Sequence, residues 1–377
     1  MKGKQGMVCM GLLLVLSSCH TGKQITASGL QRKDFQTEVN GQHTDLFTLS
    51  NKQGMEVCIT NYGARVVSIL VPDRNGKRED VVCGFSTIGE YMEQRQNFGS
   101  TVGRYIGRIL NARFTLDGVE YKLVPNNGKS GHISHGGNPG FADRIWKVEQ
   151  ADTHRVCLSY LSPDGENGFP GNLKVTLVYS LGEDDNALDL TYEATTDAPT
   201  VLNLSHHSFF NISGNFTKSV EDQQLWVDAD RFTPYDDKKC VTGEYLPVAG
   251  TPLDFRMPHA IGECIDADHP QLKVVNGYDH TWELNTKGDD TRPAAWVYDP
   301  ASGRKMEIFT TEPGMQIYTG NGLKGKMTGK GRIAYPFRSA VCFETMHFQD
   351  SPNHPGFPST VLRPGEVFRS HTVYKFE

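Results

Sequence analysis

The chain reads Leu173-Lys174-Val175-Thr176-Leu177-Val178-Tyr179 near its middle, and this stretch decides the fold class. Side chains of a β-strand point alternately to its two faces, so the apolar residues at every second position fall on one face. Two turn sequences precede the stretch, Ser162-Pro163-Asp164-Gly165 and Phe169-Pro170-Gly171. The stretch therefore predicts a β-strand with one buried face that is entered through turns.

The same pattern extends outward along the chain. Runs rich in Val, Ile, Leu, Thr and Tyr recur at residues 64–71, 187–194 and 305–310, separated by clusters of Gly, Pro, Asn and Asp. The best helix candidate, at residues 88–97, is short and polar. No linker, charge block or repeat divides the sequence after residue 35. We therefore expect an all-β fold with few short helices, built as one antiparallel domain over residues 35–377.

The composition is that of a soluble globular protein. The 377 residues include 38 Lys and Arg against 44 Asp and Glu, which gives a formal net charge of −6, and 37% are hydrophobic. This balance excludes a disordered chain, a collagen-like chain and a multispanning membrane protein. Because the chain is mildly acidic and lacks a basic block, we expect no nucleic-acid partner.

The amino-terminal segment has the order of a secretory signal peptide. Lys2 and Lys4 precede an apolar run at residues 7–16 that is too short to cross a bilayer. The run ends in Leu16-Ser17-Ser18-Cys19, which resembles the bacterial lipobox, in which the Cys is lipidated and becomes the mature amino terminus. An ordinary signal peptide that is cleaved after small residues is the alternative.

The lipobox pattern predicts three segments and a location. Residues 1–18 are the signal peptide, residues 19–34 are a flexible tether lipidated at Cys19, and the β domain follows. We expect an exported lipoprotein of the periplasm or outer membrane that contacts a membrane only through its lipid.

The other cysteines fall into two groups. Four lie inside apolar strand-like runs and are expected to pack as small hydrophobes: Cys58, Cys83, Cys157 and Cys342. Cys240 and Cys264 lie in polar segments and could pair with each other in an oxidising compartment.

A histidine pair interrupts an apolar run at residues 201–210. Alternation places Leu202, Leu204 and His206 on one face and His207 on the other, with Asn203 and Ser205. If the leucine face is core, His207 can line a cleft and transfer protons near neutral pH. Structural or surface histidines are the alternative.

A single carboxylate interrupts a second apolar run, Val341-Cys342-Phe343-Glu344-Thr345-Met346. Burying an unpaired carboxylate is costly, so Glu344 either has a cationic partner or lines a cavity as an acid or base with a shifted pKa. A structural ion pair is the alternative.

Two turn-like segments add further candidates. In His132-Ile133-Ser134-His135-Gly136-Gly137, two histidines flank a glycine bend, but a third ligand at zinc spacing is missing, so we expect no metal site. In Gly277-Tyr278-Asp279-His280-Thr281-Trp282, an acid lies beside aromatic residues, as sugar sites commonly require. A turn-capping role for Asp279 is the alternative.

Motifs along almost the whole sequence after the signal peptide occur in one order. They are Asn61-Tyr62-Gly63-Ala64, Gly103-Arg104, Arg108-Ile109, His135-Gly136-Gly137, Ser162-Pro163-Asp164-Gly165, Asn203-Leu204 with His207, Gly277-Tyr278-Asp279-His280, Gln316-Ile317-Tyr318-Thr319-Gly320-Asn321, and Glu344-Thr345 followed by Pro364-Gly365-Glu366. In this order they resemble the aldose 1-epimerase, or galactose mutarotase, family. The resemblance implies a large antiparallel β-supersandwich, and an isomerase that interconverts the α and β anomers of free aldoses such as galactose or glucose.

The resemblance also implies residue roles. Ring opening needs a base for the anomeric hydroxyl and an acid for the ring oxygen, and the family pattern gives these roles to Glu344 and His207. A charged imidazolium is then expected, because Glu344 lies close to His207. The implied substrate-binding residues are Arg108 and His135 on the ring-oxygen side, Asp279 and Gln316 at sugar hydroxyls, and Gly107, Ser208 and Phe209. No cofactor is required, a bound Ca²⁺ stays open, and a monomer is expected.

One departure from the family pattern affects the expected sugar contacts. The family usually has Asn where this sequence has Gly107. The missing amide predicts weaker monosaccharide binding, and the space left predicts room for water or for part of a larger substrate.

Two other functions remain as alternatives. A non-catalytic sugar-binding lipoprotein would keep Asp279 and the aromatic residues but would need neither Glu344 nor His207. A sugar-phosphate anomerase would need an additional cluster of Arg or Lys to bind the dianion, and the sequence offers no such cluster.

Overall fold

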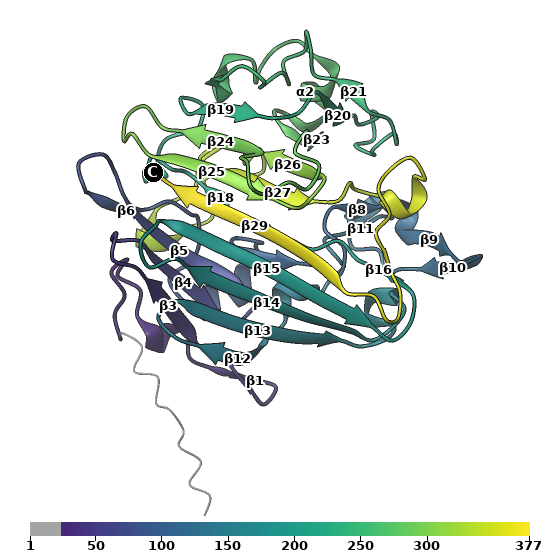
Figure 1. Ribbon diagram of the computed structural model, residues 1–377, viewed down its shortest axis with the longest axis horizontal. Helices are drawn as coiled ribbons and strands as arrows, with labels where there is room; N and C mark the ends of the chain where they lie inside the picture. The colour runs from purple at the N-terminus through teal and green to yellow at the C-terminus, as the bar shows by residue number, and fades with distance from the viewer. Residues whose placement is uncertain (1–23) are drawn as a thin grey trace, which may run out of the picture.

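The structure is a computed structural model that describes residues 24–377. Three antiparallel sheets carry most of its strands (Figure 1). The nine-stranded sheet contains, in spatial order, β12 (Lys147–Ala151), β13 (Arg155–Ser162), β14 (Leu173–Leu181), β15 (Ala187–Thr196), β29 (Phe368–Phe376), β25 (Lys305–Thr310), β24 (Ala295–Tyr298), β19 (Gln224–Val227) and β22 (His259–Ala260).

The six-stranded sheet carries the site described below. Its order is β18 (Phe209–Phe210), β27 (Val341–Met346), β26 (Gly314–Tyr318), β23 (Asp279–Glu283), β20 (Arg231–Thr233) and β21 (Leu246–Pro247). The four-stranded sheet consists of β3 (Leu46–Ser50), β4 (Glu56–Thr60), β5 (Arg65–Pro72) and β6 (Arg78–Asp80). Inner faces of all three sheets contribute to one large hydrophobic core.

Short two-stranded ribbons complete the strands of the described residues. They are β1 (Glu38–Val39) with β2 (Gln42–His43), β7 (Ser100–Val102) with β17 (Ser205–His207), β8 (Arg108–Ile109) with β11 (Ile133–Ser134), β9 (Arg113–Leu116) with β10 (Val119–Lys122), and β16 (Thr200–Val201) with β28 (Val361–Leu362). The ribbons β7–β17 and β8–β11 both reach the site.

The all-β prediction is confirmed, and β14 shows why. Its even alternation buries Leu173, Val175, Leu177 and Tyr179 completely, while the side chains between them are exposed or half-buried. β14 pairs along its whole length with β15 on one side, and with β13 on the other. The alternation of apolar residues in the sequence is therefore the alternation of buried side chains in β14.

The two α-helices are short. α1 (Ile88–Gln94) begins with a capping box between Thr87 and Glu90, and it ends three residues before the predicted limit because Arg95 takes a left-handed conformation. The second helix, α2 (Pro270–Val275), is a six-residue segment with Pro at its first position, and it was not predicted from the sequence.

β29 joins the two halves of the nine-stranded sheet, as the yellow strand in Figure 1 shows. It pairs with β15 on one side and with β25 on the other. It also contacts the six-stranded sheet, because Tyr374 Oη donates to the Phe343 carbonyl at 3.0 Å and the hydroxyls of Thr372 and Thr345 lie 2.7 Å apart. One strand thus connects both large sheets.

The predicted signal peptide and Cys19 lie outside the described residues. The described part of the predicted tether, residues 24–34, differs from a flexible chain because it packs on the domain. Thr26 and Leu30 are buried, and the Ala27 N–H donates to Glu56 Oε1 at 2.7 Å. Within residues 24–377, helices are all too short or too polar to cross a membrane.

The cysteines follow their expected environments in part. Cys58, Cys83 and Cys342 are buried, whereas Cys157 is half-buried. Cys240 and Cys264 are both free thiols, so the structure does not contain the disulfide that the sequence left open. Cys240 Sγ instead lies 3.3 Å from His132 Nε2.

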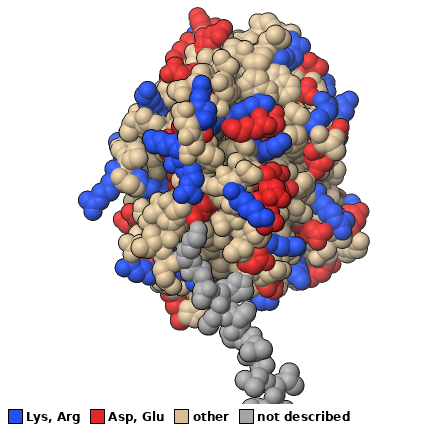
Figure 2. All heavy atoms as spheres, turned by 60° about the vertical axis from the view of Figure 1, so that its left-hand side comes forward, with Lys and Arg blue, Asp and Glu red and all other residues tan. Residues whose placement is uncertain are grey.

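Acidic and basic side chains are interspersed on the face shown in Figure 2. Among the described residues, many acidic and basic side chains form ion pairs, as Arg32 does with Asp45 and Arg338 with Asp266. This pattern is typical of a surface with a small net charge.

Candidate active site

Three neighbouring strands form one wall of the site. The register of β23, β26 and β27 places Gln316 opposite Glu344 and Thr281 opposite Gln316. Opposed residues on adjacent strands project from the same face, so these side chains lie side by side. Asp279 is two residues before Thr281 and shares that face, and Gln316 Nε2 donates to Asp279 Oδ1 at 2.6 Å.

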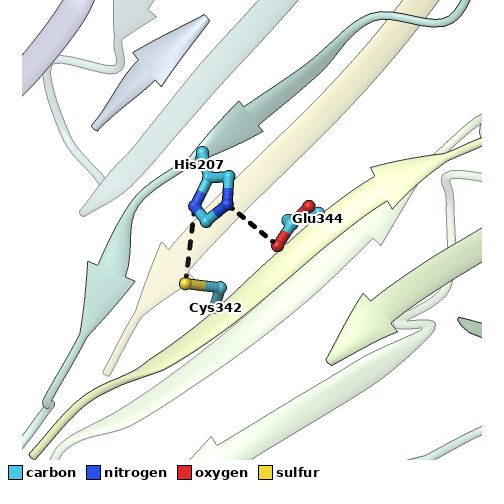
Figure 3. Close-up of side chains that lie close together, drawn as sticks. All are labelled: His207, Cys342 and Glu344. Atoms are coloured by element: carbon cyan, nitrogen blue, oxygen red, sulfur yellow. Dashed lines mark hydrogen bonds and ion pairs between the residues drawn. The ribbon is translucent and has the colours of Figure 1, made fainter. Parts of the chain in front are cut away.

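His207 reaches the same face from β17. Its Nε2 lies 3.4 Å from Glu344 Oε1, and the two side chains are only 7% and 5% exposed (Figure 3). Phe209, two residues further on, stacks on the His207 ring with centroids 5.1 Å apart. Phe209 is also opposite Cys342 in the register of β18 and β27. The alternation predicted for His207 is therefore correct.

His206 points the other way, into the core. Its ring lies between Tyr179 and Tyr374, and its Nε2 is 2.6 Å from Ser208 Oγ. Burial lowers the pKa of His206 to about 3. Ser208 is buried beside it and does not line the cavity described below, so the structure does not bring this predicted sugar contact into the site.

The opposite wall comes from the ribbon of β8 and β11. Their register pairs Arg108 with Ser134, and the His135 N–H donates to the Gly107 carbonyl at 2.8 Å. His135 is held at a φ of 51°, and its ring packs against His207 with centroids 5.5 Å apart. The Arg108 guanidinium donates to the Lys239 carbonyl at 3.3 Å. Arg108 and His135 therefore face the strands that carry Glu344 and Asp279.

These walls enclose a cavity of about 240 Å³. Eight residues predicted from the sequence line it: Gly107, Arg108, His135, His207, Phe209, Asp279, Gln316 and Glu344. Six further lining residues were not predicted as site residues: Gln96, Asn97, Ser134, Tyr318, Met346 and Gln349. Strand alternation could have identified Tyr318 from Gln316 and Met346 from Glu344, whereas Gln96, Asn97 and Gln349 lie in loops without a periodic signal.

Burial shifts the pKa values of both His207 and Glu344. Burial, with a smaller contribution from the negative Asp279, raises the pKa of Glu344 well above its ordinary value. Burial, reinforced by the nearby His135, lowers the pKa of His207 well below its ordinary value. The expectation that Glu344 favours a charged imidazolium is therefore wrong for this pair, because the loss of solvation of both groups exceeds their attraction. Both shifts favour the uncharged forms, a protonated carboxyl at Glu344 and a neutral imidazole at His207.

Two other ionisable groups of the cavity are shifted by the same cause. Burial, with a smaller contribution from Arg108, lowers the pKa of His135 to about 4, so His135 is neutral at neutral pH. Its Nδ1 is buried and has no partner among the described residues. Burial also raises the pKa of Asp279, against the opposing effects of Arg108 and Gln316. A neutral imidazole and a desolvated acid thus face each other across the cavity.

Gly107 does not leave open space. A Cβ atom built on Gly107 would lie 2.5 Å from Cγ and 3.0 Å from Cδ of Gln349, closer than real Cβ atoms approach. The prediction that water or a larger substrate occupies this space is therefore wrong. The Gln349 side chain, which follows β27 in a turn, already fills it.

The side chains in Figure 3 do not form a calcium site. His207, Cys342 and Glu344 place ligand-type atoms within 4.8 Å of one another, but Ca²⁺ takes about six to eight oxygen ligands. The imidazole also presents a different nitrogen to each neighbour, since Nδ1 faces Cys342 Sγ at 3.6 Å and Nε2 faces Glu344. This donor set does not fit the Ca²⁺ that the sequence analysis left open.

Comparisons with known proteins identify the family of this chain. The sequence model of the aldose 1-epimerase family matches residues 45–375. Galactose mutarotase from Sus scrofa is 38% identical over 88% of this chain and 93% of its own length. Aldose 1-epimerase from Escherichia coli (strain K12) is 36% identical over 89% of this chain and 96% of its own length.

Solved structures give the same result. An aldose epimerase homologue from C. elegans superposes with a TM-score of 0.81 at 30% identity, over 89% of this chain and 99% of its own. Galactose 1-epimerase from Lactobacillus acidophilus NCFM gives a TM-score of 0.79 at 28% identity, over 90% of this chain and 96% of its own. The predicted galactose mutarotase type of fold is thereby confirmed. The chain belongs to the aldose 1-epimerase family of isomerases, which interconvert the anomers of aldoses.

Proposed function

We propose that this protein interconverts the α and β anomers of a free aldose with Glu344 as the base and His207 as the acid. One observation carries the proposal: Glu344 Oε1 and His207 Nε2 lie 3.4 Å apart on the cavity wall. The anomeric oxygen O1 and the ring oxygen O5 are bonded to the same carbon, so a base for one and an acid for the other must be close neighbours. This pair meets that requirement.

Ring opening uses the single proton of the pair. Transfer of that proton from Glu344 to His207 gives a carboxylate and an imidazolium without exchange with solvent. The carboxylate then removes the proton from O1 while His207 gives its Nε2 proton to O5. The C1–O5 bond breaks, C1 and O1 become an aldehyde, and the proton on the pair now lies on Glu344.

Reclosure reverses these transfers on the other face of the aldehyde. Rotation about the C1–C2 bond presents that face to the O5 hydroxyl, which bonds to C1 and returns its proton to His207. O1 takes the proton from Glu344, so protons and electrons balance over the cycle. Every transfer is made by these two side chains, and we propose that no cofactor is required.

The remaining side chains bind and orient the sugar. His135 packs against His207 and Arg108 lines the same cavity, so both can donate hydrogen bonds to oxygens on the O5 side. Asp279 and Gln316 form a hydrogen-bonded pair on the Glu344 side, which suits the hydroxyls of ring carbons. Arg108 is the only Lys or Arg among the described residues that line the cavity, and a phosphate dianion favours several. A free sugar therefore suits the cavity better than a sugar phosphate.

Polarimetry tests this function. The protein is added to freshly dissolved single-anomer galactose, glucose, xylose, arabinose and a reducing disaccharide, and the change in optical rotation is followed. We expect approach to the equilibrium rotation faster than the spontaneous rate for at least one of these sugars. Calorimetric sugar binding without any acceleration would contradict the proposal and would favour a sugar-binding protein instead.

The pH dependence of kcat/KM is expected to reflect the pair and not either group alone. The active pair holds one proton, which it loses only above the raised pKa of Glu344, and it gains a second only below the lowered pKa of His207. Activity is therefore expected to stay constant as the pH rises through about 6.5, where an ordinary His acid would lose its proton. Initial rates in buffers of constant ionic strength measure this. An alkaline decline centred near the ordinary histidine pKa would contradict the assignment.

We also propose that the protein is an exported lipoprotein, which the sequence Leu16-Ser17-Ser18-Cys19 supports. Cys19→Ala removes the thiol that would carry the lipid, so the variant should leave the membrane fraction of expressing cells while the wild type stays in it. Immunoblots of membrane and soluble fractions decide this, with Cys264→Ala as a control that removes a thiol from the folded part. Identical distributions of wild type and Cys19→Ala would refute lipidation.

A monomer is the proposed functional unit. Among the described residues, one chain brings Glu344, His207 and the proposed sugar-binding side chains to the same cavity. Light scattering of the active protein measures the oligomeric state.

A further inference from the structure

Gly107 and Gln349 fit together as one unit in the cavity wall. Gly107 has a φ of +75°, and the position of its missing Cβ is 2.5 Å from Gln349 Cγ. Any side chain at residue 107 would collide with Gln349 as it now lies. Gln349 can therefore place its carboxamide here because Gly107 has no side chain.

The carboxamide of Gln349 is held by the sugar-binding wall. Its Nε2 donates to Tyr235 Oη at 2.7 Å and to Gln316 Oε1 at 3.2 Å, which uses both of its hydrogens. Its Oε1 accepts from the Arg108 N–H at 3.3 Å. Because a carbonyl oxygen has two lone pairs, one acceptor position on Oε1 is left. Gln349 is only 4% exposed, and it lines the same cavity as Gln316 and Arg108.

We propose that Gln349 is a sugar-binding residue that determines substrate preference, with Oε1 accepting a hydrogen bond from one sugar hydroxyl. The inference rests on the proposed function of the cavity. Its partner is a hydroxyl on a ring carbon other than C1, because Glu344 takes the C1 hydroxyl and Gln349 hydrogen-bonds Gln316 and Arg108 but not Glu344. The ligand class is an unsubstituted aldose with that hydroxyl free.

Gln349 also positions its neighbours. The turn that carries it contacts both backbone groups of Arg108, since the Asp350 N–H donates to the Arg108 carbonyl at 2.9 Å while Gln349 Oε1 accepts from the Arg108 N–H. Its Nε2 fixes the Gln316 amide so that Gln316 Nε2 faces Asp279. A change at Gln349 therefore affects a hydroxyl contact directly and the Gln316–Asp279 pair through Gln316.

The test uses a variant that keeps the side-chain volume. Gln349→Met retains the methylene groups next to Gly107 and removes only the amide. We expect KM for the preferred sugar to rise by roughly 2- to 13-fold, as for one neutral hydrogen bond, with kcat nearly unchanged. Gln150→Ala, which removes an exposed amide on β12, is the matched control and should leave both constants unchanged.

Deoxy sugars identify the contact itself. Wild type should bind one singly deoxygenated analogue more weakly than the parent sugar by a similar factor, and Gln349→Met should bind both equally. A purely structural role would lower the affinity for all analogues by the same factor. Equal losses for every analogue, or an unchanged KM in Gln349→Met, would overturn the proposal.

A rescue experiment tests the fit between the two positions. Gly107→Asn alone should lower the melting temperature and raise KM, because its side chain meets Gln349. Gly107→Asn combined with Gln349→Ala should recover both values in large part, since the amide then comes from residue 107. A double variant with the same melting temperature and KM as Gly107→Asn alone would contradict the exchange.

A failure of the proposed function can be told apart from a failure of this inference. If the wild type does not accelerate anomer interconversion, the proposed function fails, and calorimetric binding of the same sugars to the same variants still decides the role of Gln349.

Discussion

Glu344→Gln is expected to lower kcat for anomer interconversion by about 10²- to 10⁴-fold, the usual contribution of a general base. Glutamine keeps the size of the side chain and can still hydrogen-bond the anomeric hydroxyl, but it cannot take a proton. KM should therefore change little. The stability of the variant should be equal to or above that of wild type, because a buried carboxyl with a raised pKa is replaced by a neutral amide.

A second Glu–His pair, with a buried Glu312 and a half-buried His347, provides the control for this variant. Glu312 is 2% exposed and lies 2.7 Å from His347 Nδ1, outside the residues that line the cavity. Glu312→Gln should lower the melting temperature and leave kcat near wild type. If Glu344→Gln keeps kcat within a few-fold of wild type, Glu344 is not the base.

His207→Asn should reduce kcat by a similar factor, about 10²- to 10⁴-fold, because the variant has no group that can protonate O5. Asparagine is shorter but can keep a hydrogen bond to Glu344, so sugar binding measured by calorimetry should be largely retained. Polarimetry under single-anomer conditions gives kcat, and the pH profile of the residual activity should no longer show the single-proton pair.

His206→Asn tests whether only the histidine that faces the cavity, His207, contributes to kcat. His206 lies in the core against Tyr179 and Tyr374, and its substitution removes a buried ring. We expect a lower melting temperature from lost packing, with kcat of the folded fraction close to wild type. Equal losses of kcat in the two variants would show that the strand face does not separate their roles.

Strand periodicity explains how much of the site was predictable. Successive side chains of a strand point to opposite faces, so Glu344 on β27 stands out as a carboxylate in an apolar pattern, and His206 and His207 on β17 fall on different faces. The family pattern then added Arg108 and Gln316, and it gave sugar-binding roles to His135 and Asp279, which were already candidates from their own segments. Residues in loops have no such period, which is why Gln349 could be found only from the structure.

Two errors share a different cause. The sequence predicts open space at Gly107 and a charged His207, because it shows only chain neighbours and the one partner that the family pattern supplies. Whether space is open depends on side chains more than 200 residues away, here Gln349. The charge of a pair depends on how completely both groups are desolvated, and the sequence does not contain that quantity.

The position of β29 in the nine-stranded sheet has a consequence for how the protein is made. β15 and β25 are synthesised long before residues 368–376, so both keep one unpaired edge on the nascent chain until that strand arrives. Unpaired edges bind other strands, and sheets closed by distant segments form slowly. Aggregation during synthesis should therefore begin at these two edges. Proline substitutions that weaken β29 should raise the yield of insoluble protein far more than equally destabilising changes in the ribbon of β9 and β10.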